Sequence, residues 1–185
     1  MGGCTGENRR NILTKFTSSK TSSNTQNIIG VDFAAHCVDF PEDNETATLQ
    51  IWDFGEEERF RILVPMFCMG ASGAIIYINL NNPDARDEIG EWVNLLRENT
   101  PKIPIILCAP ICEEKNQNVC IDDDSLQEMI NAYNLQGYFE INIENGSNFD
   151  ETIEYLTKLM IKYYPSTILN NAAKNVPLLP TELYE

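Results

Sequence analysis

The chain has 185 residues, with 13 lysines and arginines against 28 aspartates and glutamates, so its formal net charge is −15 at pH 7. Its length fits one ordinary domain with a tail, and a content of 43% hydrophobic and 22% charged residues is globular rather than disordered. The acidic excess argues against DNA, RNA or an anionic lipid surface as the main partner and favours a protein with a basic face. The chain has no apolar run long enough to span a bilayer and no secretory leader, so we expect a cytoplasmic protein.

The cysteines and the histidine of the chain predict no metal site. Six cysteines are present, and none belongs to a CxxC pair. Cys37, Cys68 and Cys108 lie inside apolar runs, where cysteine behaves as a small hydrophobic residue, so we expect buried, reduced thiols. The single histidine, His36, lies in a strand-like stretch without partner residues and is interpreted as structural.

The first predicted element with a clear period is a β-hairpin after residue 30. Before it, the chain is Gly-rich and then basic, with a short helical phrase NILTKF and a polar loop over residues 17–27. The phrase VDFAAHCVDF alternates, and we expect one face of this strand to carry Val31, Phe33, Ala35 and Cys37. After the turn PEDNE, the phrase TATLQIWDF alternates in the same way and predicts the second strand.

The remainder of the chain alternates strands with amphipathic helices. The predicted strands are residues 74–80, 103–109 and 137–143, and the predicted helices are residues 83–98, 123–135 and 147–164. Ser147 or Asn148 is the expected N-cap of the last helix. Alternation of this kind predicts an α/β domain with a mostly parallel sheet and helices on both faces, and the hairpin adds an antiparallel edge.

Three phrases of the chain carry a family resemblance: IIGVDF, LQIWDFGEEERFR and PIILCAPICEEKNQNVC. They resemble Rab-type small GTPases of the Ras superfamily, and the resemblance extends from residue 3 to residue 163. It implies a P-loop NTPase-type small GTPase fold over residues 1–164 and an irregular tail over residues 165–185. In that family a buried central strand precedes the phosphate loop, so the resemblance implies that this first strand is missing here and that the fold is weakened. The tail has no cysteine, so no C-terminal prenyl anchor is expected.

The phosphate loop of the family, GxxxxGK[ST], is only partly matched by residues 3–10. Its glycines let backbone N–H groups hold phosphates, its lysine reaches the β- and γ-phosphates, and its Ser/Thr hydroxyl binds Mg²⁺. The residues that correspond to this loop are Gly3, Gly6, Asn8, Arg9 and Arg10. The resemblance places Arg9 at the lysine, where it keeps the charge, and Arg10 at the Mg²⁺-binding hydroxyl, where it cannot bind the ion.

The two switch motifs are similarly altered. The resemblance places Ile28 at the switch I threonine that contacts Mg²⁺, and an isoleucine side chain has no oxygen to offer. Asp53 retains the aspartate of the DxxG motif, whereas Glu56 replaces its glycine. Glu57 occupies the position that orients the attacking water in most members. The acidic residues at this turn would oppose a triphosphate.

The base-reading motifs have also lost groups. At the NKxD motif, Pro110 and Ile111 replace the asparagine and lysine, and Glu113 is a longer substitute for the aspartate that pairs with guanine. The SAK motif corresponds to Asn142, Ile143 and Glu144. Little in this set would prefer guanine strongly.

These departures leave a leading hypothesis and an alternative. The leading hypothesis is a Rab-like pseudo-GTPase that acts as a protein-interaction module in signalling or vesicle traffic, without a required cofactor. The alternative is a genuine GTP-binding switch that hydrolyses GTP slowly and uses GTP, GDP and Mg²⁺. The resemblance places a partner-binding aromatic triad at Phe33, Trp52 and Phe67, although these side chains could instead only pack the hairpin against switch II. A third possibility, a truncated product that does not fold stably, also remains open.

Overall fold

The computed structural model describes residues 31–42, 44–54, 58–111 and 120–164. Its elements, in chain order, are β1 (Val31–Phe40), β2 (Glu45–Phe54), the 3-10 helix η1 (Glu58–Leu63), α2 (Val64–Cys68), β3 (Ala74–Tyr77), α3 (Ala85–Asn99), β4 (Ile105–Ile111), α4 (Asp123–Ala132), β5 (Tyr138–Asn142) and α5 (Phe149–Tyr163). The predicted NILTKF helix and the C-terminal tail lie outside the described residues.

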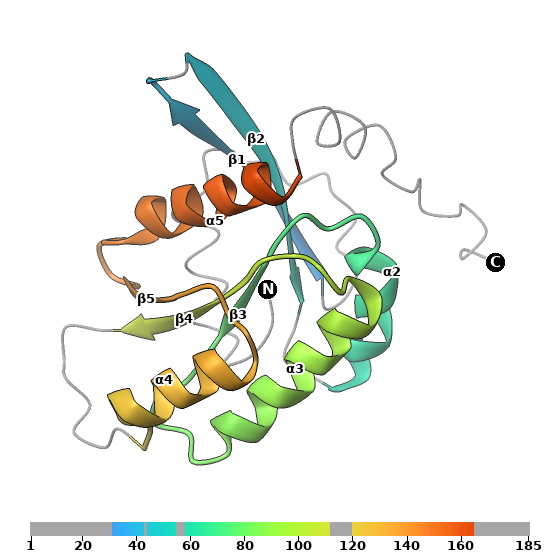
Figure 1. Cartoon of the computed structure of the whole chain (residues 1–185), viewed down its shortest axis with the longest axis vertical. Helices are drawn as coiled ribbons and strands as arrows, with labels where there is room; N and C mark the ends of the chain where they lie inside the picture. Colours follow the sequence, from blue (N-terminus) through green and yellow to red (C-terminus); the bar gives the residue numbers. More distant parts are fainter. Residues whose placement is uncertain (1–30, 43, 55–57, 112–119, 165–185) are drawn as a thin grey trace.

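The described strands form a parallel sheet and an antiparallel hairpin. The parallel sheet has the order β3-β4-β5, and β1 pairs with β2 from Val31 opposite Phe54 to Phe40 opposite Glu45. Helix α5 covers one face of the parallel sheet, and α3 and α4 cover the other (Figure 1). The predicted α/β architecture with helices on both faces is therefore confirmed. The hairpin forms a sheet of its own among the described residues, rather than an edge of the parallel sheet.

Two hydrophobic cores lie on the two faces of the parallel sheet. Because successive side chains of a strand point to opposite faces, Ile76 and Leu107 pack on the side of α3 and α4, whereas Ile75 and Ile106 pack on the side of α5. All four side chains are buried. This two-sided burial explains why the β3 and β4 sequences are almost continuously apolar.

The expected buried face of β1 is correct only in its first part. Val31 is buried, but further along the strand the buried residues are Ala34, His36, Val38 and Phe40, and Cys37 is exposed. The reason is that the strand contributes to both cores: Val31 joins the core on the α3 side, and Val38 and Phe40 join the core beneath α5. The hairpin therefore buries opposite faces at its two ends, which a single alternating pattern cannot describe.

His36 is a packed residue of the hairpin, in agreement with the structural role expected for it. Its ring meets Phe149 of α5 edge-on at a centroid distance of 5.5 Å, and its Nε2 lies 4.0 Å from a carboxylate oxygen of Asp150. Burial lowers the pKa of His36, and the nearby Asp150 carboxylate opposes this shift only in part. The neutral ring therefore helps to hold the hairpin on α5.

The cysteines are partly as expected. Cys68 and Cys108 are buried and free, and burial raises the pKa of both thiols. Cys37 and Cys120 are exposed, which the apolar surroundings of Cys37 in the sequence did not predict. No group of three or more His, Cys, Asp or Glu residues within the described ranges could hold a metal ion. None of the helices in those ranges is long and apolar enough to cross a membrane.

Asn148 is the N-cap of helix α5, as the sequence predicts, but its side chain does not make the usual capping hydrogen bond. Asn148 occupies the N-cap position with a positive φ of 68° and makes no capping hydrogen bond. Its side-chain amide instead donates to the Glu140 carbonyl of β5 at 2.9 Å. Asn148 therefore fastens the start of the helix to the sheet edge, and the left-handed backbone conformation is one that asparagine tolerates.

Candidate functional site

Asp53 is the one residue of the expected phosphate and Mg²⁺ end that the structure describes. It lies near the end of β2, opposite Asp32 in the β1–β2 ladder, and only 2% of its surface is exposed. The other expected residues of this end lie outside the described residues: Gly3, Gly6, Asn8, Arg9, Arg10, Ile28, Glu56 and Glu57. No geometry of a phosphate site can therefore be built from the described residues.

The two expected base-site segments lie side by side at the carboxyl ends of β4 and β5. Ile111 at the end of β4 is paired with Asn142 at the end of β5, and the Ile143 amide donates to the Ile111 carbonyl at 3.0 Å. The parallel register of β4 and β5 produces this arrangement, because their carboxyl ends meet at one edge of the sheet. Glu113 lies outside the described residues.

The described residues at this edge offer few side-chain groups for hydrogen bonds to a base. Pro110 has no backbone N–H to donate, and Ile111 has an apolar side chain. The Oδ1 atom of Asn142 accepts hydrogen bonds from the amides of Glu144 at 2.8 Å and Asn145 at 3.2 Å. Asn142 is therefore engaged in forming its own turn, and we derive no step of nucleotide chemistry through these residues.

The expected aromatic triad is assembled across three elements. The ring centroids of Phe33 in β1 and Trp52 in β2 are 4.8 Å apart, and those of Trp52 and Phe67 in α2 are 4.9 Å apart. Phe67 also meets the buried Phe54 edge-on at 5.7 Å. All three triad residues are only partly buried. The triad thus joins the hairpin to α2 and still reaches the surface.

Three apolar side chains are exposed on η1, α2 and the turn after α2, in the same segment of the chain as Phe67 of the triad. Ile62 is 78% exposed, Met69 is 64% exposed and Met66 is 45% exposed. We call these three residues, together with Phe33, Trp52 and Phe67, the β2–α2 surface. The run RILVPMFCM, residues 61–69, is apolar around the whole helical circumference, and one face of such a short helix has to meet water.

Arg61 connects η1 to α3. Its Nη1 atom forms an ion pair with Glu91, and its guanidinium carbon lies 5.4 Å from the ring centroid of Trp92. Trp92 is a buried residue of α3, so the core holds the ring that the Arg61 guanidinium contacts. Sequence analysis missed this contact because 30 residues separate Arg61 from Glu91 along the chain.

Comparison with known proteins identifies the family. The family model described as "Ras of Complex, Roc, domain of DAPkinase" matches residues 8–113, which is more than half of the chain. The chain is 28% identical to the Ras-related protein Rab-32B of Dictyostelium discoideum over 94% of its own length and 65% of the relative's. It is 26% identical to the Ras-related protein Rab-27A of Rattus norvegicus, over 86% of the chain and 76% of the relative.

A third relative, the GTP-binding protein ypt4 of Schizosaccharomyces pombe, is 24% identical over 82% of the chain and 65% of the relative. The chain therefore spans slightly less than two thirds of the length of two of these three curated relatives. The family match, the Rab-related sequences and the α/β fold agree with one another, and the chain belongs to the Ras-type small GTPase family, with Rab proteins among its relatives.

Proposed function

We propose that this protein is a Rab-like pseudo-GTPase, a protein-interaction module in signalling or vesicle traffic that works without bound nucleotide in the cytoplasm. Its interaction site would be the β2–α2 surface, and its GTP site would no longer bind nucleotide tightly. The proposed domain covers residues 1–164, followed by a tail of residues 165–185.

The observation that carries this proposal is the chemistry of the base end. Selective guanine binding in this family depends on paired hydrogen bonds between protein side chains and the base, and buried polar groups that lose their partners cost about 1–3 kcal/mol each. Pro110 and Ile111 offer no such side-chain group, and the Oδ1 atom of Asn142 already accepts hydrogen bonds from two backbone amides. The sequence changes at Arg10 and Ile28 remove oxygen ligands for Mg²⁺ at the opposite end.

The contacts of the region that corresponds to switch II support a fixed conformation. Trp52 contacts the Phe67 ring of α2 at a tilt and Phe54 meets it edge-on, and Arg61 contacts Glu91 and Trp92 of α3. These contacts come from side chains of the protein itself and need no γ-phosphate. A surface held in one conformation would suit constitutive binding, because the partner would not have to order it.

The chemistry of the β2–α2 surface suggests the character of the partner. Aromatic and methionine side chains are enriched at protein interfaces, and exposed apolar residues grouped in one place mark such sites. The net charge of −15 would attract a partner with a basic face and would favour basic groups around an apolar centre. We therefore propose a partner that covers Ile62, Met66 and Met69 with apolar side chains and surrounds them with lysine or arginine.

Nucleotide binding is the decisive test of this proposal. We expect calorimetry of the full chain with GTP or GDP and Mg²⁺ to show no sub-micromolar binding, and we expect no nucleotide in the purified protein after denaturation. Copurified nucleotide, or a sub-micromolar constant, would overturn the pseudo-GTPase assignment. ATP serves as the control for nonspecific triphosphate binding.

The interaction surface has a separate test. Ile62→Asp and Met69→Asp change side chains that are already exposed, so the fold should survive, and we expect both to lose capture of a partner isolated with the unmodified protein. Tyr163→Asp on α5, where the side chain is 47% exposed, is the matched control and should retain capture. Equal loss in all three variants would contradict the assignment of the surface.

The alternative is a nucleotide-dependent switch with diverged motifs. The relative ypt4 is named a GTP-binding protein, and the chain is similar to it over 82% of its length. Under this alternative, GTP and GDP would bind with Mg²⁺ and the β2–α2 surface would bind its partner differently in the two states. The same calorimetric experiment separates the alternatives.

A further inference from the structure

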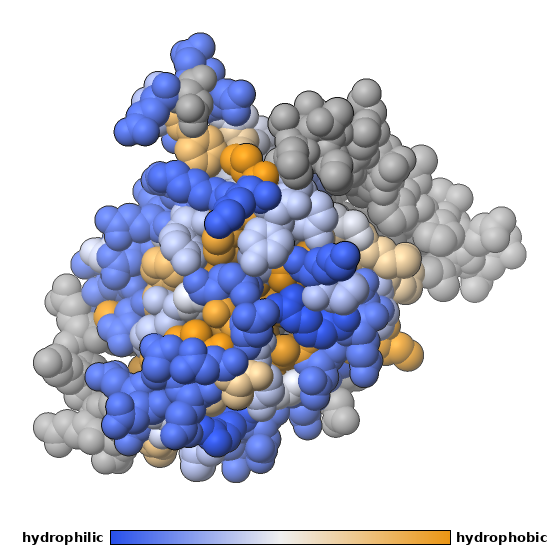
Figure 2. All heavy atoms as spheres, viewed as in Figure 1, coloured by the Kyte–Doolittle hydropathy of each residue, from blue (hydrophilic) through white to orange (hydrophobic). Residues whose placement is uncertain are grey.

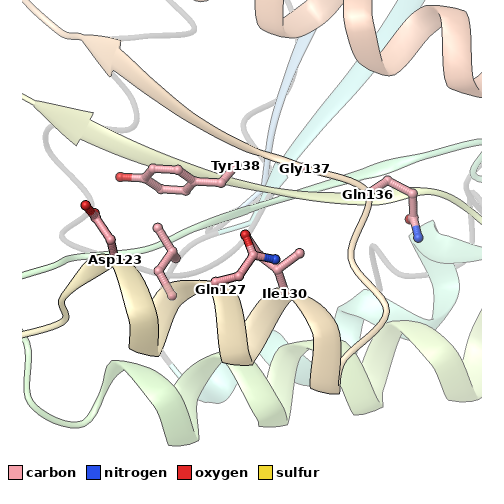
Figure 3. A pocket seen from close by; sticks show the side chains of 7 residues that line it. Asp123, Gln127, Ile130, Gln136, Gly137 and Tyr138 are labelled. Carbon is pink, nitrogen blue, oxygen red and sulfur yellow. The ribbon is translucent and has the colours of Figure 1, made fainter.

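A groove lies between α4 and the segment that leads into β5. It has a volume of about 420 Å³ and is lined by Asp123, Leu126, Gln127, Ile130, Gln136, Gly137 and Tyr138. We call it the α4–β5 groove. Its volume is within the range of ligand clefts in proteins, about 300–1,000 Å³. Leu126, Ile130 and the Tyr138 ring are the apolar part of its lining. Figure 3 shows Ile130 on α4 and Tyr138 on the segment across from it.

Two hydrogen-bond acceptors lie on the helical side of the groove. Asp123 and Gln127 are four residues apart on α4, which places them on one face of the helix. The side-chain amide nitrogen of Gln127 donates to Asn131 at 3.3 Å, which leaves its carbonyl oxygen as the group suited to a ligand. Figure 3 shows the Asp123 carboxylate and the Tyr138 hydroxyl at the same end of the groove.

The opposite wall of the groove is held rigidly by the protein. Gln136 accepts a hydrogen bond from the Ile105 amide at 2.7 Å and donates to the Asn134 carbonyl at 2.6 Å. The Tyr138 hydroxyl donates to the Glu140 carboxylate at 3.0 Å. Both side chains are therefore oriented before any ligand arrives, which lowers the entropy cost of binding.

Asp123 is the charged side chain among the residues that line the groove. None of its lining residues is basic, and Glu140 adds a carboxylate beside Tyr138. Burial raises the pKa of the Tyr138 hydroxyl, and the Glu140 and Asp123 carboxylates raise it further. The side of the molecule seen in Figure 2 is mostly hydrophilic over α4 and α5. A cationic ligand is the complementary one.

The backbone of the exposed edge of β5 limits how a partner protein could bind beside the groove. Gly137 and Ile143 bond to β4, so the intervening Tyr138, Glu140 and Asn142 direct their backbone groups outward. The Glu140 carbonyl is occupied by Asn148, and Asn142 exchanges hydrogen bonds with Ser147 and Gly146. Because most of these outward backbone groups already have hydrogen-bond partners, a partner protein could add few β-strand hydrogen bonds to this edge. A partner would therefore be recognised through a side chain that it inserts into the groove.

We propose that the α4–β5 groove binds an arginine side chain of a protein partner. The planar guanidinium can stack on the Tyr138 ring while it donates to the Asp123 carboxylate and the Gln127 carbonyl oxygen. The aliphatic part of the arginine would contact Leu126 and Ile130. A second copy of this chain is a poor occupant, since both copies would carry a net charge of −15.

This site is separate from the β2–α2 surface. Figure 1 shows α4 and α2 on opposite sides of α3. The inference does not depend on whether nucleotide binds or on which partner covers Ile62 and Met69. Its failure would leave the proposed function untouched, and the reverse also holds.

A titration followed by nuclear magnetic resonance tests the groove directly. The ¹⁵N-labelled full chain is titrated with N-acetyl-arginine N-methylamide, and with the citrulline analogue, which has the same shape without the charge. We expect the arginine probe to shift the amide signals of Gln127, Gly137 and Tyr138, and we expect the citrulline probe to shift them little. Because the site is partly open, Asp123→Asn should weaken binding about twofold to fivefold.

Asp124→Asn is the matched control. Asp124 lies in the same first turn of α4, is exposed and does not line the groove, so its change removes the same charge from the same helix end. A second variant, Gln127→Met, removes an acceptor without a change of charge and should also weaken the arginine probe. The proposal is overturned by equal shifts with citrulline, by shifts confined to other regions, by the absence of shifts, or by an Asp124→Asn effect as large as that of Asp123→Asn.

Discussion

Replacement of Arg61 by alanine should loosen α2 without unfolding the domain. Arg61 ties η1, which runs directly into α2, to Glu91 and Trp92 of α3. The variant loses both contacts and leaves the Trp52–Phe67 stacking in place. If these contacts hold the switch II region in one conformation, α2 should open locally more often.

The expected magnitude follows from the exposure of the groups. The Arg61 and Glu91 side chains are 31% and 60% exposed, and pairs of this kind contribute about 0.2–1 kcal/mol. The stacking of the cation on Trp92 adds about 0.5–1 kcal/mol. Together they give about 0.7–2 kcal/mol, which corresponds to about a 3- to 30-fold increase in the population of the open state.

Native-state hydrogen exchange measures this population at individual amides. We expect the amides of Met66, Phe67 and Cys68 to exchange about 3- to 30-fold faster in Arg61→Ala, while those of α5 keep their rates. Arg86→Ala is the matched control, because it removes an exposed ion pair with Glu128 that joins α3 to α4 and does not touch α2. Unchanged exchange in Arg61→Ala, or equal acceleration of α2 in Arg86→Ala, would refute the reasoning.

Three further predictions concern the fold. Burial lowers the pKa of His36 below its ordinary value of 6.5, so the unfolded chain binds the proton more readily than the folded chain. The contribution of the neutral His36 ring to stability should therefore be complete above pH 6.5 and should decrease as the pH falls through the folded-state pKa. His36→Gln should remove that part of the pH dependence in urea melts, and an unchanged profile would contradict it. A Cβ on Gly90 would lie 2.7 Å from the Tyr133 hydroxyl oxygen, so Gly90→Ala should destabilise the protein by about 1–3 kcal/mol, and less in a Tyr133→Phe background. A Cβ on Gly73 would lie 2.8 Å from the Met160 sulfur, so Gly73→Ala should lower the urea midpoint of unfolding. An unchanged midpoint would show that the space between Gly73 and Met160 can accommodate a methyl group.

The sequence by itself was sufficient for the elements whose environment is uniform along their length. β3 and β4 are covered on both faces, so their residues are apolar throughout and predict buried strands. The period of α3 is readable for a similar reason, because one stripe that includes Ile89, Trp92 and Val93 packs on the core.

Only the tertiary structure could decide features that depend on residues distant in the chain. β1 buries Val31 in one core and Val38 in the other, and its local alternation cannot reveal where the strand passes from one core to the other. The ion pair of Arg61 with Glu91 depends on the packing of η1 against α3. The α4–β5 groove exists because Asp123 and Tyr138 belong to neighbouring elements of the folded chain. Local sequence specifies which residues share a face of one element, whereas burial and contact depend on which element that face meets.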